Sequence, residues 1–353
     1  MSDLHQQYMF RCLELARLGA GFVSPNPMVG AVLVYQNRII GEGWHKKYGG
    51  PHAEVNCIHA VDPSDEHLIP DSTLYVSLEP CAHFGKTPPC SQLIIDKKIP
   101  KVIIACRDPF AAVNGKGIEQ LQKAGIEVIT GVLEREAVEL NRRFFKFHQQ
   151  QQPYVILKWA QTDDGFMAGN SNDRLLITRE QTNRIVHRWR SEEAAILIGT
   201  DTAIKDNPSL TNRYWFGKSP LRLVVDKHLR IPGHLTMFND DEPVVIFNLQ
   251  KDEVQGHLRF VKISSDRSFI DQLFAYCYQQ GIQSILVEGG VKLLQSFIDE
   301  ERWDEARVIT NTSLRIGSGL AAPRIHEPHF LDSLNSATDQ IKIYLSQKIK
   351  ITV

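Results

Sequence analysis

The chain has 353 residues, of which 42% are hydrophobic and 23% charged, and its formal net charge at pH 7 is -1. These proportions are ordinary for a globular protein and exclude a disordered or fibrous one. The balanced charge excludes an overall basic field that would attract a nucleic acid. We therefore expect no nucleic-acid partner. Because single cores seldom grow beyond about 250–300 residues, we expect two globular domains.

The N-terminal region lacks the apolar core of a signal peptide, since Asp3, Glu14 and several polar residues occupy it. Nowhere does the sequence contain a run of about 18 apolar residues. We therefore expect a cytoplasmic protein with no membrane partner. In such a compartment thiols stay reduced, so cysteines that cluster indicate a metal or catalytic site rather than disulfides.

The first elements predicted are a helix, a loop and a β-hairpin. Apolar residues recur at helical spacing over residues 4–18. "SPNP" (residues 24–27) predicts an extended, rigid loop, because a residue that precedes proline is pushed out of the helical region. "MVGAVLVY" and "RIIGEGW" flank Gln36 and Asn37, a pattern typical of two paired strands.

Strands and helices then alternate, which predicts a mostly parallel sheet with helices on its faces. Helices are expected at about 52–60, at about 90–98 and over "GIEQLQKAG"; strands are expected over "TLYVSLE", "KVIIAC" and "IEVITGV". An amphipathic helix from Glu134 to about His148 leads into "QQQQP" (149–153), a polar tract and helix breaker that predicts the linker.

The second half also has an α/β pattern. Strands are expected over "YVILKWA", "AAILIG", "LRLVVD", "PVVIFN" and "SILVEGG", and helices at about 269–280 and 291–299. "ITREQ" predicts a helix start with Thr178 as N-cap and Gln181 as its capping-box partner. The C-terminal "QIKIYLSQKIKITV" alternates apolar and polar residues, as antiparallel strands with one wet face do.

"PHAEVNC" (51–57) and "LEPCAHFGKTPPC" (78–90) together predict a catalytic metal site. A catalytic zinc site has three protein ligands and an open position, and the chemistry needs a carboxylate that moves protons without binding the metal. His52, Cys81 and Cys90 are the predicted ligands and Glu54 the predicted proton shuttle. This is the residue set of zinc deaminases, in which an activated water attacks the carbon that bears an exocyclic amine.

Eight residues separate the two cysteines where the usual deaminase signature has two, but the order of elements still fits a deaminase. The alternative is a closed structural zinc site with His83, Cys57 or His59 as fourth ligand. Cys57 lies about 140° around the helix from His52, which makes joint ligation awkward. We expect Cys57, Cys12, Cys277 and Cys106 to be core residues.

Two stretches of the second half suggest ligand binding. "VEGGVKLLQSF" (287–297) is a strand, a glycine pair and a helix, which suits a phosphate but equally a tight turn without a ligand, and it lacks the G-x-G-x-x-G fingerprint. "GTDTAIKDNPSLTNR" (199–213) is expected to be a polar loop, in which Arg213 could clamp a phosphate. From the residues alone, Arg184, Arg188 and Arg190 are expected to be solvated surface charges.

With these motifs in place, the chain resembles the RibD family of riboflavin biosynthesis over nearly its whole length. The first half carries "PNPMVGAV", "GEGWH", "GGPHAEVN", "LYVSLEPCAHFGKTPPC" and "DP" at Asp108-Pro109 in the order of that family. The second half carries "KWAQTDDG", "GTDT", "DNPSLTNR", "LRLVVD" and "VEGGVKLL". The long insert between the cysteines is itself the pattern of this family.

The resemblance implies a cytidine deaminase-like α/β/α domain over residues 1–149, a zinc-dependent pyrimidine deaminase, and a dihydrofolate reductase-like α/β domain over 150–353, an NADPH-dependent reductase. One Zn²⁺ per chain and NADPH are the implied cofactors. The implied reactions are deamination of 2,5-diamino-6-(5-phosphoribosylamino)pyrimidin-4(3H)-one and reduction of the ribosyl group to ribityl, giving 5-amino-6-(5-phosphoribitylamino)uracil. We also expect a homo-oligomer.

The resemblance also implies site residues. Asn26 is expected to touch the pyrimidine. The implied NADPH contacts are Ala160, Thr202, Asp206, Gly290, Val291, Lys292, Leu293, Leu294, Gln295 and Ser296. The implied contacts to the sugar phosphate substrate are Arg190, Leu210, Arg213 and Glu288. Arg174, Leu176 and Lys227 depart from the family pattern and are left out of the site.

Two other functions are weighed. The first is a zinc deaminase of a free nucleoside or tRNA base with a non-catalytic C-terminal domain, which would predict a basic surface or a two-residue gap between the cysteines. The second is a non-catalytic protein that uses zinc only for stability and binds a flavin precursor as a regulator.

Overall fold

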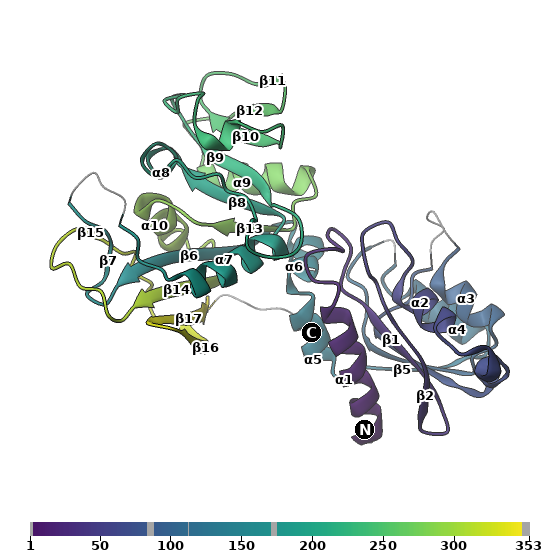
Figure 1. Ribbon diagram of the computed structural model, residues 1–353. Helices are drawn as coiled ribbons and strands as arrows, with labels where there is room; N and C mark the ends of the chain where they lie inside the picture. The colour runs from purple at the N-terminus through teal and green to yellow at the C-terminus, as the bar shows by residue number, and fades with distance from the viewer. Residues whose placement is uncertain (1–2, 83–87, 112, 171–174, 348–353) are drawn as a thin grey trace. The chain divides into compact units, whose positions relative to one another are not determined.

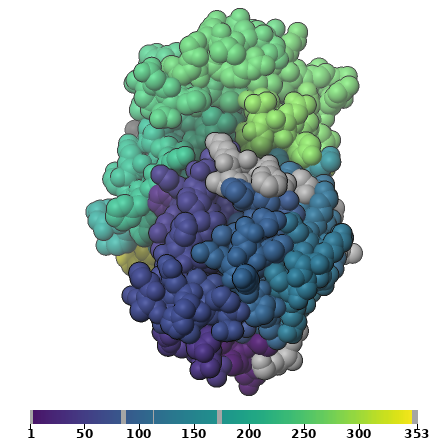
Figure 2. Space-filling view, turned by 90° about the vertical axis from the view of Figure 1, so that its right-hand side faces the viewer, coloured from purple at the N-terminus to yellow at the C-terminus, as the bar shows by residue number. Residues whose placement is uncertain are grey.

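The computed structural model describes residues 3–82, 88–111, 113–170 and 175–347. The chain separates into two compact units, with the boundary between Gln151 and Gln152. In Figures 1 and 2 the first unit runs from purple to blue, and most of the second is teal to green. No helix in the described part is both long enough and apolar enough to span a bilayer.

The first unit is built on a five-stranded sheet with the order β2-β1-β3-β4-β5. β1 pairs antiparallel with β2 and β3, whereas β3, β4 and β5 are parallel. The strands are β1 (Gly30–Tyr35), β2 (Arg38–Trp44), β3 (Thr73–Leu78), β4 (Lys101–Cys106) and β5 (Glu127–Thr130). The helices are α1 (Asp3–Arg17), α2 (Ala53–His59), η1 (Pro63–Asp71), α3 (Cys90–Asp96), α4 (Lys116–Lys123), α5 (Glu134–Leu140) and α6 (Arg142–Gln150).

Helices cover both faces of this sheet (Figure 1). Side chains alternate between the faces of a strand, and in β1 Val32 and Val34 pack with α1, α5 and α6. Ala31 and Leu33 point the other way and pack with α2, α3 and α4. The expected α/β/α layering is confirmed.

The predicted hairpin is confirmed, because Gln36 and Asn37 have φ angles of 45° and 66°, as the two central residues of a type I′ turn require. The prediction of an extended "SPNP" loop is wrong. The N–H of Asn26 donates to the carbonyl of Val23 at 2.9 Å, which closes a tight turn around a cis Ser24-Pro25 bond.

The single helix expected from Glu134 to His148 is also wrong, because α5 and α6 are separated at Asn141. The side chain of Asn141 accepts a hydrogen bond from the N–H of Met28 and donates one to its carbonyl, both at 2.8 Å. This contact is remote in sequence, so helical periodicity could not reveal it. α6 continues to Gln150, which makes the linker shorter than the expected tract.

The second unit is built on a ten-stranded sheet with the order β11-β12-β10-β9-β8-β13-β6-β14-β17-β16. Neighbouring strands are parallel throughout the run β12-β10-β9-β8-β13-β6-β14. The strands β11, β17 and β16 add antiparallel edges. The strands are β6 (Tyr154–Thr162), β8 (Ala195–Gly199), β9 (Leu221–Val225), β10 (Val244–Asn248), β11 (Glu253–Gln255), β12 (Leu258–Lys262), β13 (Ser284–Val287), β14 (Glu305–Asn311), β16 (His329–Ser336) and β17 (Asp339–Leu345). A small second sheet pairs β7 (Phe166–Ala168) with β15 (Leu320–Ala321).

The helices that cover this larger sheet in the described part of the chain are α7 (Glu180–Glu192), α8 (Thr200–Asp206), the short 3₁₀ turn η2 (Thr236–Phe238), α9 (Phe269–Gln279) and α10 (Val291–Asp299). In β6, Val155 and Leu157 pack with α9 and α10. Tyr154 and Ile156 face the opposite side, where α7 lies.

Two predictions for this unit are wrong in detail. Thr178 is not the N-cap of α7; Arg179 holds that position, and the Thr178 hydroxyl bonds to Asn183 at 2.8 Å instead. The expected polar loop 199–213 contains the helix α8, whose last carbonyls are closed off by Asn207 in the left-handed conformation. Within the predicted C-terminal stretch β17 is an antiparallel strand as expected; its partner β16 precedes that stretch and was not predicted, and residues 348–353 lie outside the described residues.

Candidate active sites

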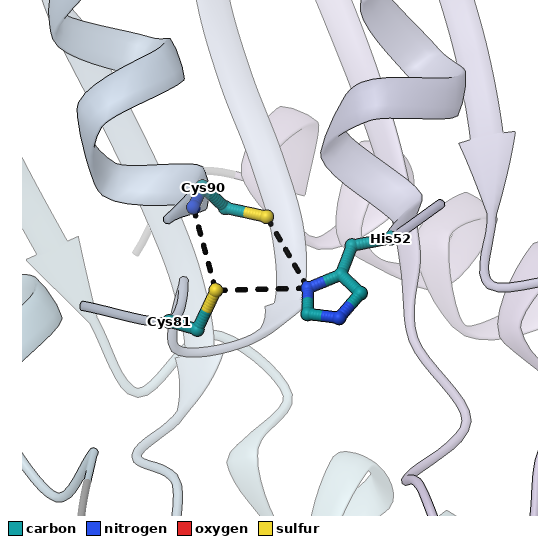
Figure 3. A group of neighbouring side chains, drawn as sticks. All are labelled: His52, Cys81 and Cys90. Atoms are coloured by element: carbon teal, nitrogen blue, oxygen red, sulfur yellow. Dashed lines mark hydrogen bonds between the residues drawn. The ribbon is translucent and has the colours of Figure 1, made fainter. Parts of the chain in front are cut away.

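The three predicted zinc ligands lie close together in the first unit (Figure 3). The donor atoms of His52, Cys81 and Cys90 all lie within 4.8 Å of one another. Nδ1 of His52 lies 3.6 Å from Sγ of Cys81 and 3.4 Å from Sγ of Cys90. One imidazole and two thiolates form a donor set that zinc favours. Among the described residues no other His, Cys, Asp or Glu joins this group, and three protein ligands are the number that catalytic zinc sites use.

The position of His52 depends on how α2 rests on β2. A Cβ on Gly43 would lie 2.2 Å from the backbone nitrogen of Cys57, so only glycine permits this close approach. The Asn56 side chain donates to the carbonyls of Trp44 and Pro51 at 2.7 and 3.2 Å, which fixes the entry to the helix. His52 is the N-cap residue, just before the helix rather than in its first turn as expected.

Cys81 is held by a buried carboxylate two residues before it. Glu79 accepts backbone N–H bonds at 2.9 Å from Gly115 and Gly117, and longer ones from Asp108 and Ile118. Three of these bonds join the end of β3 to the segment that starts α4, and the bond from Asp108 joins it to the segment after β4. The N–H of Cys90 donates to Sγ of Cys81 at 3.3 Å, and hydrogen bonding by Cys90 and His52 lowers the pKa of Cys81 well below its ordinary value.

Glu54 lies beside the metal-ligand group without belonging to it. Its side chain is buried, at 3% exposure, and interacts with the Cys90 thiol. Burial raises the pKa of Glu54 above its ordinary value. A carboxylate in this position suits the predicted proton shuttle.

Asn26 is connected to the metal-ligand group through His45. The Asn26 amide donates to Nε2 of His45 at 3.1 Å, and Nδ1–H of His45 donates to the Pro51 carbonyl at 3.0 Å. The His45 ring lies edge-on to the His52 ring, 5.5 Å between centroids. Sequence reasoning missed His45, although it stands in the "GEGWH" motif, because the motif alone does not show which residue the ring bonds.

The other four cysteines are buried core residues, as predicted. Sγ of Cys57 donates to the Gly41 carbonyl at 3.4 Å and faces β2 rather than the ligands. Among the proposed fourth ligands, His59 is exposed on the surface and His83 lies outside the described residues. The part of the chain that the structure describes thus offers no support for a closed structural site.

In the second unit, Arg190 and Glu288 form a buried bidentate ion pair. The Arg190 guanidinium donates from Nε and Nη2 to the two carboxylate oxygens at 2.8 and 2.7 Å, and Nζ of Lys158 lies 3.6 Å from the same carboxylate. Burial would raise the pKa of Glu288, but the charges of Arg190 and Lys158 outweigh it and hold the pKa at about 2. The expectation from residues alone that Arg190 is a solvated charge is wrong; for Arg184 and Arg188, which are exposed and paired to glutamates, it is confirmed.

The glycine pair after β13 contacts one of the predicted cofactor residues. A Cβ on Gly289 would lie 2.7 Å from Cγ2 of Thr202, and Gly290 has a φ of 77°, which disfavours any other residue. The first bond inside α10 runs from Leu294 N–H to the Gly290 carbonyl, which leaves the N–H groups of the first helical residues without an intrahelical partner. Such an end attracts phosphate, so this turn suits the pyrophosphate of NADPH.

Not every expected cofactor residue can reach a ligand through its side chain. The Leu294 side chain is fully buried in the core, the Gln295 amide bonds to Asp299, and the Ser296 hydroxyl donates to the Leu293 carbonyl. Ala160 lies near the carboxyl end of β6 and pairs with Ile309.

The remaining predicted substrate residues lie on the segment after α8. Leu210 is only 2% exposed and its side chain packs in the core, so any contact it makes with a ligand is through its backbone. The N–H of Arg213 donates to Nδ1 of His187, a residue that sequence reasoning did not single out. Of the three departures from the family pattern, Arg174 lies outside the described residues, Leu176 is 76% exposed, and the Lys227 carbonyl accepts from Leu249.

Comparisons with known proteins match both units. Residues 2–106 match the family described as the cytidine and deoxycytidylate deaminase zinc-binding region, and residues 153–337 match the RibD C-terminal domain. The chain is 38% identical over 324 residues to the riboflavin biosynthesis protein RibD of Aquifex aeolicus, covering 90% of each chain. It is 39% identical over 311 residues to RibD of Bacillus amyloliquefaciens, covering 86% of this chain and 83% of the relative.

Solved structures match over almost the whole length. The diaminohydroxyphosphoribosylaminopyrimidine deaminase/5-amino-6-(5-phosphoribosylamino)uracil reductase of Thermotoga maritima superposes with a TM-score of 0.88 at 35% identity, covering 97% of this chain and 99% of that one. RibD of Acinetobacter baumannii superposes with a TM-score of 0.89 at 30% identity, covering 98% and 99%.

The fold, the metal-ligand group and these matches define a bifunctional enzyme, a zinc-dependent deaminase joined to an NADPH-dependent, dihydrofolate reductase-like domain. The chain covers 90% of the Aquifex aeolicus relative and 99% of the Thermotoga maritima structure, so the match extends over both units. The chain belongs to the RibD family of riboflavin biosynthesis. A nucleoside or tRNA-base deaminase with a non-catalytic second domain is therefore not the function.

Glu79 provides the first test of how the metal site is held. Substitution Glu79→Leu should leave four N–H groups without an acceptor, three of them buried and that of Gly115 partly buried, at a cost of about 1–3 kcal/mol for each that stays unpaired. We expect the first unit to lose stability and the protein to release zinc to a chelator faster. Zinc content after dialysis and chelator competition measure this. Glu79→Gln, which keeps one acceptor oxygen, should lose less; equal zinc retention in both variants would contradict the role of these bonds.

The low pKa of Glu288 predicts a pH dependence of stability. The unfolded chain has a Glu288 pKa near its ordinary value, about 4.3, and therefore binds a proton first as the pH falls. The stabilisation is complete above about pH 4.5 and is lost as the pH falls toward 2. The free energy of unfolding of the wild type should exceed that of Glu288→Gln by about 3–5 kcal/mol near neutral pH, since the variant strands buried cations.

That difference should shrink as the pH falls from about 4.5 toward 2. Urea unfolding followed by tryptophan fluorescence measures it, because Trp159, Trp189 and Trp303 are buried in the second unit. A difference that stays constant over this range would show that Glu288 does not titrate as its partners imply.

Proposed function

We propose that residues 1–149 deaminate 2,5-diamino-6-(5-phosphoribosylamino)pyrimidin-4(3H)-one and that residues 150–353 reduce the ribosyl group of the product with NADPH, giving 5-amino-6-(5-phosphoribitylamino)uracil. The observation that carries the deaminase half is the three-ligand group of His52, Cys81 and Cys90 with Glu54 beside it. The Thermotoga maritima protein is described by the same pair of activities and supports the substrate assignment.

In the deamination, water adds to the carbon that bears the amine, and the carbon–nitrogen bond then breaks to leave a carbonyl and ammonia. Zinc held by the three ligands would supply Lewis acidity that makes bound water acidic. Glu54 takes one proton from the water and passes it to the ring nitrogen, and then carries the remaining hydroxyl proton to the departing nitrogen, so that both water protons are accounted for without a second acid. The Asn26 amide, aligned by His45, is proposed to contact the pyrimidine.

Substitution Glu54→Gln tests the proton shuttle and separates catalysis from a purely structural zinc site. Gln keeps the volume of the side chain and cannot move a proton, so ammonia release should fall by roughly 10²- to 10⁴-fold. Zinc content should stay at that of the wild type. Cys81→Ser is the matched control, because it should lose zinc and ammonia release together. Unchanged ammonia release in Glu54→Gln would rule out Glu54 as the proton shuttle.

For the reduction, we propose that NADPH lies along the carboxyl ends of β6, β8 and β13, the edge where open α/β sheets bind ligands. Bound NADPH would supply the hydride. The backbone of Gly290 to Ser296, together with Ala160, Thr202 and Asp206, is proposed to hold the cofactor. Thr202 against the Gly289-Gly290 turn supports this assignment. Arg213, Arg190, Leu210 and Glu288 are proposed to bind the sugar phosphate.

Substitution Gly290→Ala tests the cofactor turn. A side chain at a φ of 77° is strained and displaces the N–H groups proposed to face the pyrophosphate. We expect the KM for NADPH to rise about tenfold or more while ammonia release in the first reaction stays unchanged. NADPH absorbance with the deaminated substrate measures the former. A KM for NADPH equal to that of the wild type would place the cofactor elsewhere.

We also propose that the protein is a cytoplasmic homo-oligomer that binds neither nucleic acid nor membrane. Its six free cysteines fit a reducing compartment, and its net charge of -1 gives no attraction to polyanions. Light scattering measures the oligomeric state.

A further inference from the structure

The segment that carries Arg213 is attached to α7 at two points. Nη1 of Arg190 donates to the Thr211 carbonyl at 3.1 Å, and the N–H of Arg213 donates to Nδ1 of His187 at 2.9 Å. His187 and Arg190 are three positions apart in the helix and therefore share one face. Upstream, Leu210 anchors the segment in the core. The backbone that leads to Arg213 is thus fixed by Leu210 in the core, by the bond to the Thr211 carbonyl and by the bond from the Arg213 N–H.

The bond from Arg213 specifies the state of the His187 ring. Because a backbone N–H can only donate, Nδ1 must be the acceptor, and the neutral ring carries its proton on Nε2. The ring is 5% exposed and lies edge-on to Tyr214, 4.6 Å between centroids. Burial, together with the charges of Arg190 and Arg213, lowers the pKa of His187 to about 4, and Glu288 opposes this shift. The ring therefore remains an acceptor at neutral pH.

We propose that His187 is a positioning residue of the reductase, whose Nδ1 fixes the Arg213 backbone and thereby the direction in which that guanidinium meets the substrate phosphate. This inference rests on the proposed function of Arg213 as a phosphate ligand. His187 itself does not touch the substrate. A histidine that served only to fill the core would not need a nitrogen at Nδ1, whereas a positioning residue does.

A pair of amide substitutions separates these roles. In Asn the side-chain oxygen can occupy the place of Nδ1, while in Gln it reaches only the place of Nε2. In the full-length zinc-loaded protein, His187→Gln and His187→Leu should raise the KM for the deaminated pyrimidine ribose phosphate on the order of tenfold, as the loss of one buried acceptor implies. His187→Asn should stay near the wild type. The KM for NADPH and ammonia release should be unchanged in all three.

Inorganic phosphate provides a second readout, because it should inhibit the reductase competitively with the sugar phosphate and should do so more weakly in His187→Gln than in His187→Asn. If the Leu variant fails to fold, the Asn and Gln variants still decide. Equal KM values for Asn and Gln, or a KM for NADPH that moves in parallel, would overturn the inference.

Arg213→Met tests the proposed phosphate binding by Arg213 separately from the positioning role of His187. If Arg213→Met leaves the KM for the sugar phosphate unchanged, the proposed role of Arg213 fails. If Arg213→Met raises that KM but His187→Gln does not, the role of Arg213 stands and only the positioning by His187 is wrong.

Discussion

The metal site depends on the close packing of α2 against β2. Without side chains at Gly41 and Gly43, the helix backbone approaches the strand so closely that a Cβ at either position would overlap the Cys57 backbone. Zinc ligands tolerate errors of only about 0.2 Å, so a helix displaced by the width of a methyl group would carry His52 out of reach of the two thiols. The glycines of "GEGW" therefore act on the metal through the packing of the core, without touching the ligands.

The second unit buries a charged group, the carboxylate of Glu288. A carboxylate removed from water is costly unless cations and hydrogen bonds replace the water. Arg190 and Lys158 do this for Glu288 at the carboxyl end of β13. Because three Arg190 nitrogens already donate to Glu288 and Thr211, its charge is largely balanced before a substrate arrives. In the proposed reductase site, the charge available to the substrate phosphate then comes chiefly from Arg213, and on that proposal its backbone position matters.

The spacing of apolar residues and the positions of turn residues predicted the central strands, α9, α10 and the hairpin, because these elements depend on local sequence. The errors occur where a partner distant in sequence decides the structure. Asn141 ends α5 by bonding Met28, and the Arg179 N–H bonds Asp339, so local capping patterns were not enough. Arg190 is the sharpest case: its sequence neighbours Arg184 and Arg188 are chemically identical, and only the fold places it against Glu288.

The three residues of the candidate metal site could be singled out from the sequence because each stands at a boundary that the sequence marks, a helix start or a strand end. Glu79, His45 and His187 could not, since their importance lies in which backbone group each one bonds. Three buried glutamates illustrate the difference. Glu79 is occupied by four N–H donors and Glu288 by two cations, and both serve to hold other groups in place. Glu54 is buried beside the thiols with no such set of cations, a setting in which a carboxylate accepts a proton more readily. What surrounds a buried carboxylate, rather than its burial, separates a structural role from a catalytic one.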